Sequence, residues 1–480
     1  MAGVLARLLW KRAANRMATR ALHRFGARVH RFKLTAKSEI AASLMADPVI
    51  AEAVETHSRE NGIAPADVWR RVGTYIDEMV PFFSILAYYR IGYNVSRAVL
   101  NLFYKVTVDQ ARPSSVAVLP RDAVVIYLMN HRSNADYVLV GYALSGQVAI
   151  SYAVGEWARA FPLEYVFKTF GSYFIRRRFR EALYHSVLER YVQLITRNGV
   201  TQGIFPEGGL TRDGRLQPGK IGLLDYVLGA GRDPDFRRRL YLVPVGINYD
   251  RVLEDRSLLQ ELEVRDGKRA RPSRLSQAAG VARFAVWNAT RLVTQRWRRY
   301  GRAAVIIGDP VSLEPWFAEQ GGDALFALSR HDRLARVGSL CDSAMRRIGA
   351  LVPVTPVPLA CAALQSFDGD FVSRKVLLER MSDMRTVLLA LDAQVLKAEG
   401  SIEETFERAY VMLRMRRVIS LVGDGFLVLP RGRPLISYYA NSVAHLLGPF
   451  EEGIRSRDAL PAMSATGELP EPARQRTPLA

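Results

Sequence analysis

Residues 130–136, NHRSNAD, combine an imidazole and a carboxylate at a spacing that could support acid–base chemistry. They follow the apolar run VVIYLM at 124–129, which predicts a buried strand. On one continuous helix His131 and Asp136 would be separated by about 140° around the axis, so the chain must turn between them if they meet. The serine and asparagine between them are typical of such a turn. A carboxylate bonded to one imidazole nitrogen fixes the tautomer, and the other nitrogen can then take a proton from a hydroxyl.

Residues 205–215, FPEGGLTRDGR, follow the apolar run GIF and contain groups suited to a polar substrate. Gly208 and Gly209 have no side chains, so backbone N–H groups there can approach a ligand closely and could stabilise an oxyanion. The side chains that could contact substrate are Glu207 as an acceptor, Thr211 as a donor and Arg212 as a phosphate partner. A tight strand-to-helix turn with a charged surface is the alternative interpretation.

A further polar group follows an aromatic strand in GSYFIRRRFR, residues 171–180. In chain order it is the second polar stretch, and residues 205–215 are the third. Arg176, Arg177 and Arg178 come at the end of that strand, and guanidinium groups bind phosphate in a bidentate way. Because neighbouring residues of a strand face opposite ways, we expect one of Arg176 and Arg177 to point into a site. The alternative is a solvated basic patch. A fourth stretch, YLVPVGINYDRVLED at 241–255, predicts a buried strand and a polar turn.

The elements that must position these groups alternate between short apolar runs and helical patterns from 120 to 310. This alternation predicts an α/β fold with a mixed, mostly parallel sheet flanked by helices. In such sheets the site lies beyond the carboxyl ends of the strands, where NHRSNAD is expected. The expected strands are 124–129, 148–154, 172–176, 203–206, 241–247 and 303–308, and the expected helices between them include 180–197 and 217–230.

The chain divides into five expected segments around that α/β region. The N-terminal 37 residues contain ten Lys or Arg and no acidic residue, in an amphipathic pattern typical of a membrane interface. A nucleic-acid arm and an organellar transit peptide are alternatives for that segment. The segments are a basic membrane-associating segment at 1–37, a helical region at 38–110, the catalytic domain at 111–312, a helical C-terminal domain at 313–460 and a disordered tail at 461–480. Within the C-terminal domain, helices are expected at 323–350, 372–399, 402–417 and 435–448.

The composition favours some classes of function and argues against others. The formal charge of +20 favours an anionic partner such as a lipid surface. Two cysteines exclude a disulfide framework and a zinc site built on cysteines, and the seven scattered histidines show no ligand spacing, so no metal is expected. We find no apolar run that is long enough and free of charge to predict a transmembrane helix. No GxSxG motif occurs, which argues against a serine hydrolase.

Taken together and in this order, the four polar stretches resemble the motif blocks of the glycerolipid acyltransferase family. NHRSNAD is similar to the NHxxxxD block, YFIRRRF to the second block, FPEGGLTRDG to FxEGxRSRxG, and VPVGINYDRVLE to the fourth. AAVIIGDP at 303–310 resembles the strand that follows in these enzymes. The wording of the fourth block and the stretch SYYANSVAHLL at 437–447 favour the branch that acylates glycerol 3-phosphate. Leu210 stands where the third block usually has its first arginine.

The resemblance implies that His131 deprotonates the sn-1 hydroxyl of glycerol 3-phosphate while Asp136 orients the imidazole. It further implies that Arg176, Arg177 and Arg212 hold the phosphate and that Glu207 holds the free hydroxyl. The acyl donor would be acyl-CoA or acyl carrier protein, used as a co-substrate without a bound cofactor, and the product would be lysophosphatidic acid. Attachment to an anionic membrane surface, at the cytoplasmic face of the bacterial inner membrane, is expected, and nucleic acid is not an expected partner.

Two kinds of alternative remain open from the sequence. The first keeps the chemistry and changes the acceptor to dihydroxyacetone phosphate or lysophosphatidate. The second is a non-catalytic, basic membrane-binding protein on the same scaffold. Acyl-chain preference, the type of donor, oligomeric state and the mode of membrane attachment do not follow from the residues.

Overall fold

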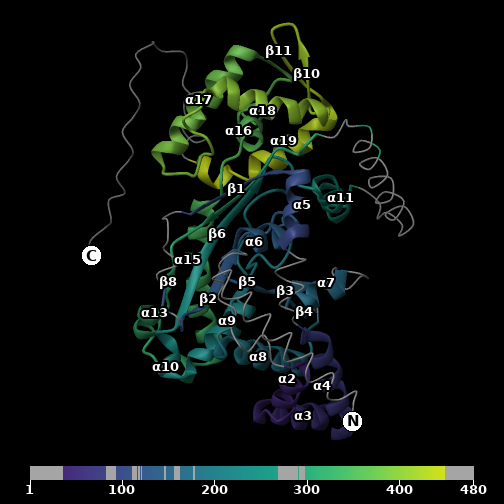
Figure 1. Cartoon of the computed structure of the whole chain (residues 1–480), viewed down its shortest axis with the longest axis vertical. Coiled ribbons are helices and arrows are strands. Elements are labelled where there is room, and N and C mark those ends of the chain that lie inside the picture. The colour runs from purple at the N-terminus through teal and green to yellow at the C-terminus, as the bar shows by residue number, and fades with distance from the viewer. Residues whose placement is uncertain are drawn as a thin grey trace, which may run out of the picture.

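The computed structural model describes residues 36–82, 93–110, 116, 119–120, 122–144, 148–155, 163–176, 179–268, 290, 294 and 298–448. The expected tail at 461–480, Arg177 and nearly all of the expected membrane segment at 1–37 lie outside these residues. Figure 1 shows the helices of residues 37–79 at one end of the long axis, the central sheet in the middle, and the helices of residues 356–441 at the other end.

The central sheet has eight strands in the order β1-β7-β6-β2-β5-β3-β4, with β8 paired to β6. The pairs β1–β7, β6–β2, β2–β5, β5–β3 and β3–β4 are parallel, whereas β6–β7 and β6–β8 are antiparallel. The predicted mixed, mostly parallel α/β fold is therefore confirmed. The strands are β1 Lys105–Gln110, β2 Val124–Met129, β3 Ser151–Gly155, β4 Tyr173–Ile175, β5 Gln202–Ile204, β6 Leu240–Tyr249, β7 Arg302–Ile307 and β8 Val311–Ser312.

Strand β2 is buried on both faces, as a central parallel strand requires. Its odd-numbered residues, such as Tyr127 and Met129, belong to one hydrophobic core, and its even-numbered residues, such as Ile126 and Leu128, belong to the other. Successive side chains of a strand point to opposite faces, so one strand serves two cores. The helices between the strands are α6 Asp136–Leu144, α7 Leu163–Thr169, α8 Ala182–Arg197, α9 Gly222–Leu228, α10 Pro234–Arg237, α11 Asp255–Arg265, α13 Glu314–Glu319 and α14 Ala324–Ala327, with a 3-10 turn, η4 Gly229–Arg232.

The first three N-terminal helices pack in the core on the side of α8, whereas Leu100 of the fourth belongs to the opposite core. Helix α3 begins at Pro48, where Asp47 caps the backbone N–H of Val49 and Ile50, and it is followed by Gly62 at φ 63°. These helices are α2 Lys37–Met45, α3 Pro48–Asn61, α4 Pro65–Met79 and α5 Tyr93–Phe103. Strand β1 pairs with β7, so residues 105–110 belong to the central sheet, although the sequence analysis placed them in the helical region. The alternation of KVTVDQ is short, and only pairing with β7 reveals it as a strand.

The C-terminal region is mostly helical but contains structure that the sequence analysis missed. A three-stranded antiparallel sheet has the order β10-β11-β9, and most of it lies between the expected helices, where no strand was predicted. Helix α16 was also missed, because it is buried all round and shows no amphipathic period. The elements are α15 Arg330–Leu351, α16 Pro356–Gln365, β9 Phe371–Ser373, α17 Arg374–Ala390, α18 Ile402–Met415, β10 Ile419–Val422, β11 Gly425–Val428, η5 Pro430–Gly432 and α19 Arg433–Asn441.

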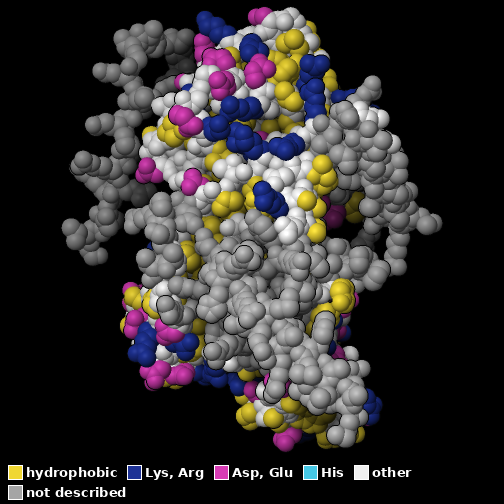
Figure 2. Space-filling model, viewed as in Figure 1, with side chains coloured by type: hydrophobic (Ala, Val, Ile, Leu, Met, Phe, Trp, Pro, Cys, Tyr) yellow, Lys and Arg dark blue, Asp and Glu magenta, His cyan; other side chains and the backbone are white. Residues whose placement is uncertain are grey.

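The surface of the C-terminal region carries gathered basic side chains, with acidic ones scattered among them (Figure 2). Across the described residues, no helix combines the length and the apolar character needed to span a bilayer. Helix α15 packs in the core on the side of α8 and α9, and α16, α18 and α19 belong to the opposite core. The C-terminal region therefore contributes to both faces of the central sheet.

Candidate active site

The site is built at the carboxyl end of β2, beside the last residues of β6. Asn130, the residue after β2, donates from its side chain to the carbonyl of Ile247 at 2.9 Å and accepts from the N–H of Ile247 at 2.8 Å. This amide extends the pairing of the two strands by one residue and is buried. The chain beyond Asn130 is thus anchored to the fourth polar stretch before it turns.

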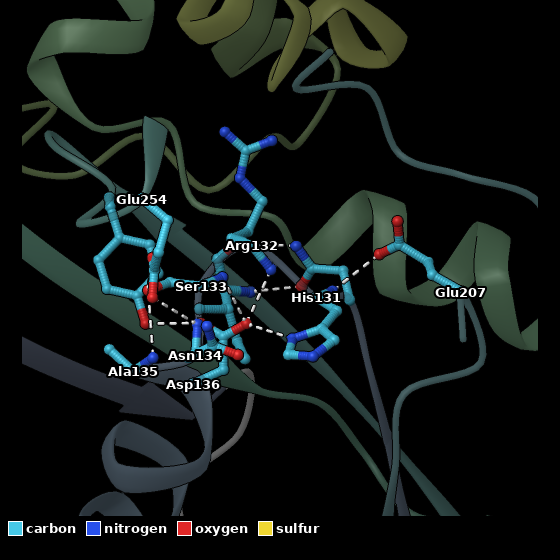
Figure 3. Close-up of polar contacts among 11 residues, drawn as sticks. His131, Arg132, Ser133, Asn134, Ala135, Asp136, Glu207 and Glu254 are labelled. Carbon is cyan, nitrogen blue, oxygen red and sulfur yellow. Dashed lines mark hydrogen bonds and ion pairs between the residues drawn. The ribbon is translucent and has the colours of Figure 1, made fainter. Parts of the chain in front are cut away.

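The turn that follows brings His131 and Asp136 together. The Nδ1 atom of His131 lies 2.9 Å from Oδ2 of Asp136, and both side chains are buried, with exposed fractions of 1% and 0%. The same oxygen accepts the backbone N–H groups of Arg132 at 2.7 Å and Ser133 at 3.0 Å. Asp136 begins α6, so its carboxylate holds the turn and the imidazole together. Figure 3 shows these contacts converging on the carboxylate.

Two aromatic residues from the neighbouring strands complete the surroundings of the pair. The Tyr249 hydroxyl, at the end of β6, donates to Oδ1 of Asp136 at 2.6 Å. Burial raises the pKa of Tyr249 well above its ordinary value, and the nearby Asp136 carboxylate adds to the effect. Phe205 stacks on the His131 ring at a centroid distance of 4.0 Å. The imidazole therefore has a fixed plane, with Nδ1 toward Asp136.

Glu207 reaches the pair from the third polar stretch. One carboxylate oxygen accepts the backbone N–H of His131 at 2.8 Å, and the other accepts that of Gln217 at 3.1 Å. Burial raises the pKa of Glu207 to about 7, against the lowering effect of these two hydrogen bonds. Glu207 is 5% exposed, and its hydrogen bond to the N–H of His131 connects the third polar stretch to the turn at residues 130–136, which we call the catalytic turn.

Gly208 and Gly209 differ in how their backbone N–H groups are used. Gly208 has a φ of +69°, and its N–H donates to the carbonyl of Phe205 at 2.9 Å. The expectation that this N–H would face a substrate oxyanion is therefore wrong, because a turn uses the donor. Gly209 makes no hydrogen bond to a described residue. Thr211 donates its N–H to the carbonyl of His131 at 3.2 Å and its hydroxyl to Asp213 at 3.0 Å, which fastens the loop to the catalytic turn.

The arginines expected to hold phosphate are engaged elsewhere where the structure describes them. Arg176 forms a bidentate ion pair with Glu78 of α4, at 2.9 and 2.6 Å, and lies against the rings of Tyr75, Phe179 and Tyr184. Arg212 pairs with Glu261 at 3.0 Å on the surface. The ion pair of Arg176 joins β4 to the N-terminal helices, whereas that of Arg212 is half-exposed and weak in water.

The neighbouring Arg132 points away from the imidazole, toward the C-terminal helices (Figure 3). Its guanidinium lies 5.2 Å from the ring centre of Tyr438 in α19, and one nitrogen donates to the carbonyl of Gly214. Gly214 has a φ of +86°, and a Cβ there would lie 1.9 Å from the Tyr438 carbonyl oxygen. Only glycine permits this close approach between the third polar stretch and α19.

Helix α19 also contacts the fourth polar stretch. The Tyr439 hydroxyl donates to Asp255 at 2.6 Å and accepts the N–H of Val252 at 3.1 Å. Asn248 donates to Ser442 at 3.2 Å, just beyond the helix. Three of the four polar stretches therefore rest on one helix of the C-terminal region.

Sequence reasoning missed several residues of this site. Tyr249 and Glu254 lie in the fourth stretch; Glu254 accepts from the Ser133 hydroxyl at 2.7 Å and from the Asn134 N–H at 3.2 Å. Figure 3 places Glu254 and Glu207 on opposite sides of the catalytic turn. The polar turn directly after the buried strand at 241–247 could have indicated these residues. The carboxyl ends of neighbouring parallel strands lie at the same edge of a sheet, so this turn had to lie near NHRSNAD.

Comparison with known proteins agrees with this geometry. Residues 113–248 match the family model described as Acyltransferase, and residues 286–449 match the one described as Glycerol-3-phosphate acyltransferase C-terminal region. The second match contains α19, and the first contains both members of the His131–Asp136 pair.

Two of the similar curated proteins are glycerol-3-phosphate acyltransferases, from Aeromonas hydrophila and Pseudoalteromonas translucida. Each is 26% identical, over 437 and 431 residues respectively, which is 86% of this chain and 50% of each relative. The chain spans about half the length of the curated relatives it matches. A solved 1-acyl-sn-glycerophosphate acyltransferase from Thermotoga maritima is 19% identical, with a TM-score of 0.29 over 50% of this chain and 80% of that one. The chain therefore contains a region that matches the Acyltransferase family model and one that matches the Glycerol-3-phosphate acyltransferase C-terminal model, and it is similar over most of its length to curated glycerol-3-phosphate acyltransferases.

Proposed function

We propose that this chain transfers a fatty acyl group from a thioester donor to the sn-1 hydroxyl of glycerol 3-phosphate. The product would be lysophosphatidic acid, so the reaction would be the first step of phospholipid biosynthesis. The observation that carries the proposal is the buried His131–Asp136 contact of 2.9 Å at the end of a central strand. The names of the curated relatives support the choice of acceptor.

The geometry supports a general-base mechanism. Asp136 engages Nδ1 of His131, so Nε2 is the ring nitrogen that takes the proton of the acceptor hydroxyl. The hydroxyl oxygen then attacks the thioester carbonyl carbon, the C–O bond forms, and the C–S bond breaks. The proton held by His131 passes to the departing thiolate. The Asp136 carboxylate stabilises the charged imidazole between these two transfers.

The reaction written this way needs no bound cofactor, because the thioester supplies the leaving group. Acyl-CoA and acyl carrier protein both fit the excess of positive charge on the chain. For the acceptor phosphate, Arg177 and Arg212 remain the proposed partners from the second and third blocks, with Gly209 and Thr211 nearby in the loop. Arg176 is the less suitable candidate for that role, because its guanidinium is paired with Glu78.

Thiol release from palmitoyl-CoA by the purified protein in detergent tests the reaction. Glycerol 3-phosphate, dihydroxyacetone phosphate and lysophosphatidate would be added separately, with acyl carrier protein as a second donor. We expect release that depends on glycerol 3-phosphate and falls by about 10²–10⁴-fold in His131→Ala. Release with another acceptor alone would reassign the substrate. No acceptor-dependent release with either donor would overturn the proposal and favour a binding protein on this scaffold.

Membrane association belongs to the same proposal, at the cytoplasmic face of the bacterial inner membrane. Ten basic residues and no acidic residue in 1–37 suit an anionic lipid surface. Co-sedimentation with phosphatidylglycerol vesicles should be strong at low salt and weaker at high salt, and deletion of 1–37 should reduce it. Equal binding to neutral vesicles would contradict this attachment.

A further inference from the structure

Three arginines meet beyond the end of β6, close to the catalytic turn. Arg251 lies in the loop after the strand, Arg256 is on the first turn of α11, and Arg416 follows α18. One nitrogen of Arg256 lies 3.4 Å from the carbonyl oxygen of Arg416. Burial lowers the pKa values of Arg251 and Arg256, and the positive charge of Arg416 lowers them further. The three side chains therefore share one local electrostatic environment.

The negative charge that contacts this cluster is small. Among the described residues, Asp255 is the carboxylate bonded to it: it accepts from Arg416 at 2.5 Å. The same carboxylate also accepts from the Tyr439 hydroxyl at 2.6 Å and from the backbone N–H of Arg256 at 2.7 Å. One carboxylate already shared in this way leaves two guanidinium charges without an acidic partner.

Arg251 shows the imbalance most clearly. Its side chain is in the interior, with the residue 5% exposed, and its guanidinium lies 3.6 Å from the ring centre of Tyr300. Its Nε atom has no hydrogen-bond partner, and the guanidinium forms no ion pair with a described residue. Arg176, by contrast, is more exposed and is paired in a bidentate way with Glu78. A buried cation without a partner is costly, so an anion supplied by a ligand would stabilise it.

The loop that carries Arg251 is held rigidly in place. The Tyr104 hydroxyl donates to the Arg251 carbonyl at 2.8 Å, and the Val252 N–H donates to Tyr439. On the preceding residue, the Asp250 carboxylate accepts the N–H groups of Arg302 at 2.7 Å and Val357 at 3.0 Å. A preformed loop presents its charge without a further cost of ordering.

The loop also touches the catalytic turn at two points. Tyr249, two residues before Arg251, donates to Asp136, and Glu254, three residues after it, accepts from Ser133 and Asn134. Arg256 is exposed, so the cluster opens to solvent on that side. Arg132, another buried arginine near the turn, has its Nε and Nη2 atoms both buried without a hydrogen-bond partner, whereas in Arg251 this holds for Nε alone. The cluster at Arg251 can therefore be approached from solvent on the side of Arg256.

We propose that Arg251, with Arg256 and Arg416, forms a subsite for a phosphate group of a substrate beside the His131 turn. The inference rests on the proposed function for the identity of the substrates. That phosphate is carried either by the acceptor, glycerol 3-phosphate, or by the CoA portion of the donor. Both present the same chemistry to the arginines, a doubly charged oxyanion that guanidinium groups bind in a bidentate way.

The test uses the full-length protein with Arg251→Met and Arg256→Gln as variants. Methionine keeps contact with the Tyr300 ring and removes the charge. Arg265→Gln is the matched control, because Arg265 is an exposed arginine of the same helix whose ion pair is with the adjacent Asp266. Arg251→Lys keeps the charge and loses the planar fork, so partial recovery of binding is expected from it.

Equilibrium binding of glycerol 3-phosphate and of CoA is measured by calorimetry without turnover, together with both KM values. We expect at least tenfold weaker binding of one ligand in Arg251→Met, a smaller loss in Arg256→Gln, and none in Arg265→Gln. The ligand that weakens identifies the source of the phosphate. Unchanged affinity for both ligands, or wild-type protein that binds neither, would overturn the subsite.

Two further outcomes distinguish the phosphate subsite from the proposed function and from a purely structural role of Arg251. If the wild-type protein binds a ligand through Arg251 but releases no thiol, the proposed function is contradicted and the subsite is still supported. A purely structural role predicts that Arg251→Met lowers the melting temperature and changes kcat, while a subsite predicts an unchanged or higher melting temperature and a change in KM. If Arg251→Met fails to fold, the exposed Arg256→Gln alone decides by the same binding measurement.

Discussion

The hydroxyl of Tyr249 lies 2.6 Å from Oδ1 of Asp136, while Oδ2 of the same carboxylate lies 2.9 Å from the His131 ring. One carboxylate thus connects the ends of β2 and β6, two neighbouring parallel strands. The imidazole is oriented through a residue of the fourth polar stretch as well as through its own turn.

Tyr249→Phe tests how far the Tyr249 hydroxyl contributes to stability and to the positioning of the Asp136 carboxylate. It removes the hydrogen bond to Oδ1 and leaves the ring packing, so we expect a loss of about 1–3 kcal/mol in unfolding free energy. We further expect kcat to fall by roughly tenfold, because the carboxylate is less firmly held. Urea unfolding and thiol-release kinetics measure the two effects. Tyr173→Phe is the control, since its hydroxyl donates to Gln202 at 3.4 Å, away from the catalytic turn; an equal fall of kcat there would contradict the assignment.

Asp136→Asn tests the charge of the carboxylate with little change of shape. The asparagine oxygen can still accept the N–H groups of Arg132 and Ser133, and its amide can donate to Tyr249. We therefore expect the fold to persist while kcat falls by about 10²–10⁴-fold, because the imidazolium loses its counter-charge. Circular dichroism and kinetics check this. Asp225→Asn, which alters the remote ion pair with Arg333, should leave kcat unchanged.

Glu207 should make stability depend on pH in a defined window. Its pKa of about 7 in the folded chain is higher than the ordinary 4.5, so its contribution is fully present below pH 4.5 and is lost as pH rises through 7. Relative to Glu207→Gln, the wild type should lose about 3 kcal/mol of unfolding free energy between pH 4.5 and 8. Denaturant titrations of both proteins at several pH values measure the difference. A difference that stays constant with pH would show that the carboxyl is not perturbed.

Arg176→Met should affect stability more than substrate affinity. It breaks the ion pair with Glu78, whose side chain is 9% exposed, and we expect a loss of roughly 1–3 kcal/mol in unfolding free energy. The KM for glycerol 3-phosphate should stay within about twofold, since the guanidinium is already occupied. The double variant with Glu78→Gln should recover part of the stability. A large rise in KM with unchanged stability would restore Arg176 to the phosphate site.

Gly214→Ala should disturb the contact between the third polar stretch and α19. The new Cβ would lie 1.9 Å from the Tyr438 carbonyl oxygen, so the loop must move. Gly423→Ala is the matched control, because Gly423 also has a positive φ, 57°, but a Cβ there meets nothing within 4 Å. The control should lose about 1–2 kcal/mol of unfolding free energy and no activity. Gly214→Ala should lose more stability and at least tenfold in kcat; similar behaviour of the two variants would argue against the contact.

The sequence by itself determined the fold class and indicated that His131 and Asp136 could meet. Alternation of apolar runs with helical patterns is a local property, so the strand at 124–129 and a helix at 180–197, observed at 182–197, could be predicted directly. The types of His131 and Asp136, their turn-forming neighbours and their place after a strand were enough to bring the two together. The resemblance to a family then rested on four stretches in order.

The tertiary structure decided which partners the other polar residues have. Arg176 and Arg251 are both arginines near the ends of strands, yet one is paired with Glu78 and the other lies on Tyr300. Glu78 lies about 100 positions from Arg176 in the sequence, and Tyr300 lies about 50 positions from Arg251. No local sequence pattern encodes contacts over such separations. The same reason applies to α19: its support of three polar stretches depends on how distant segments pack, which the chain specifies only through the complete fold.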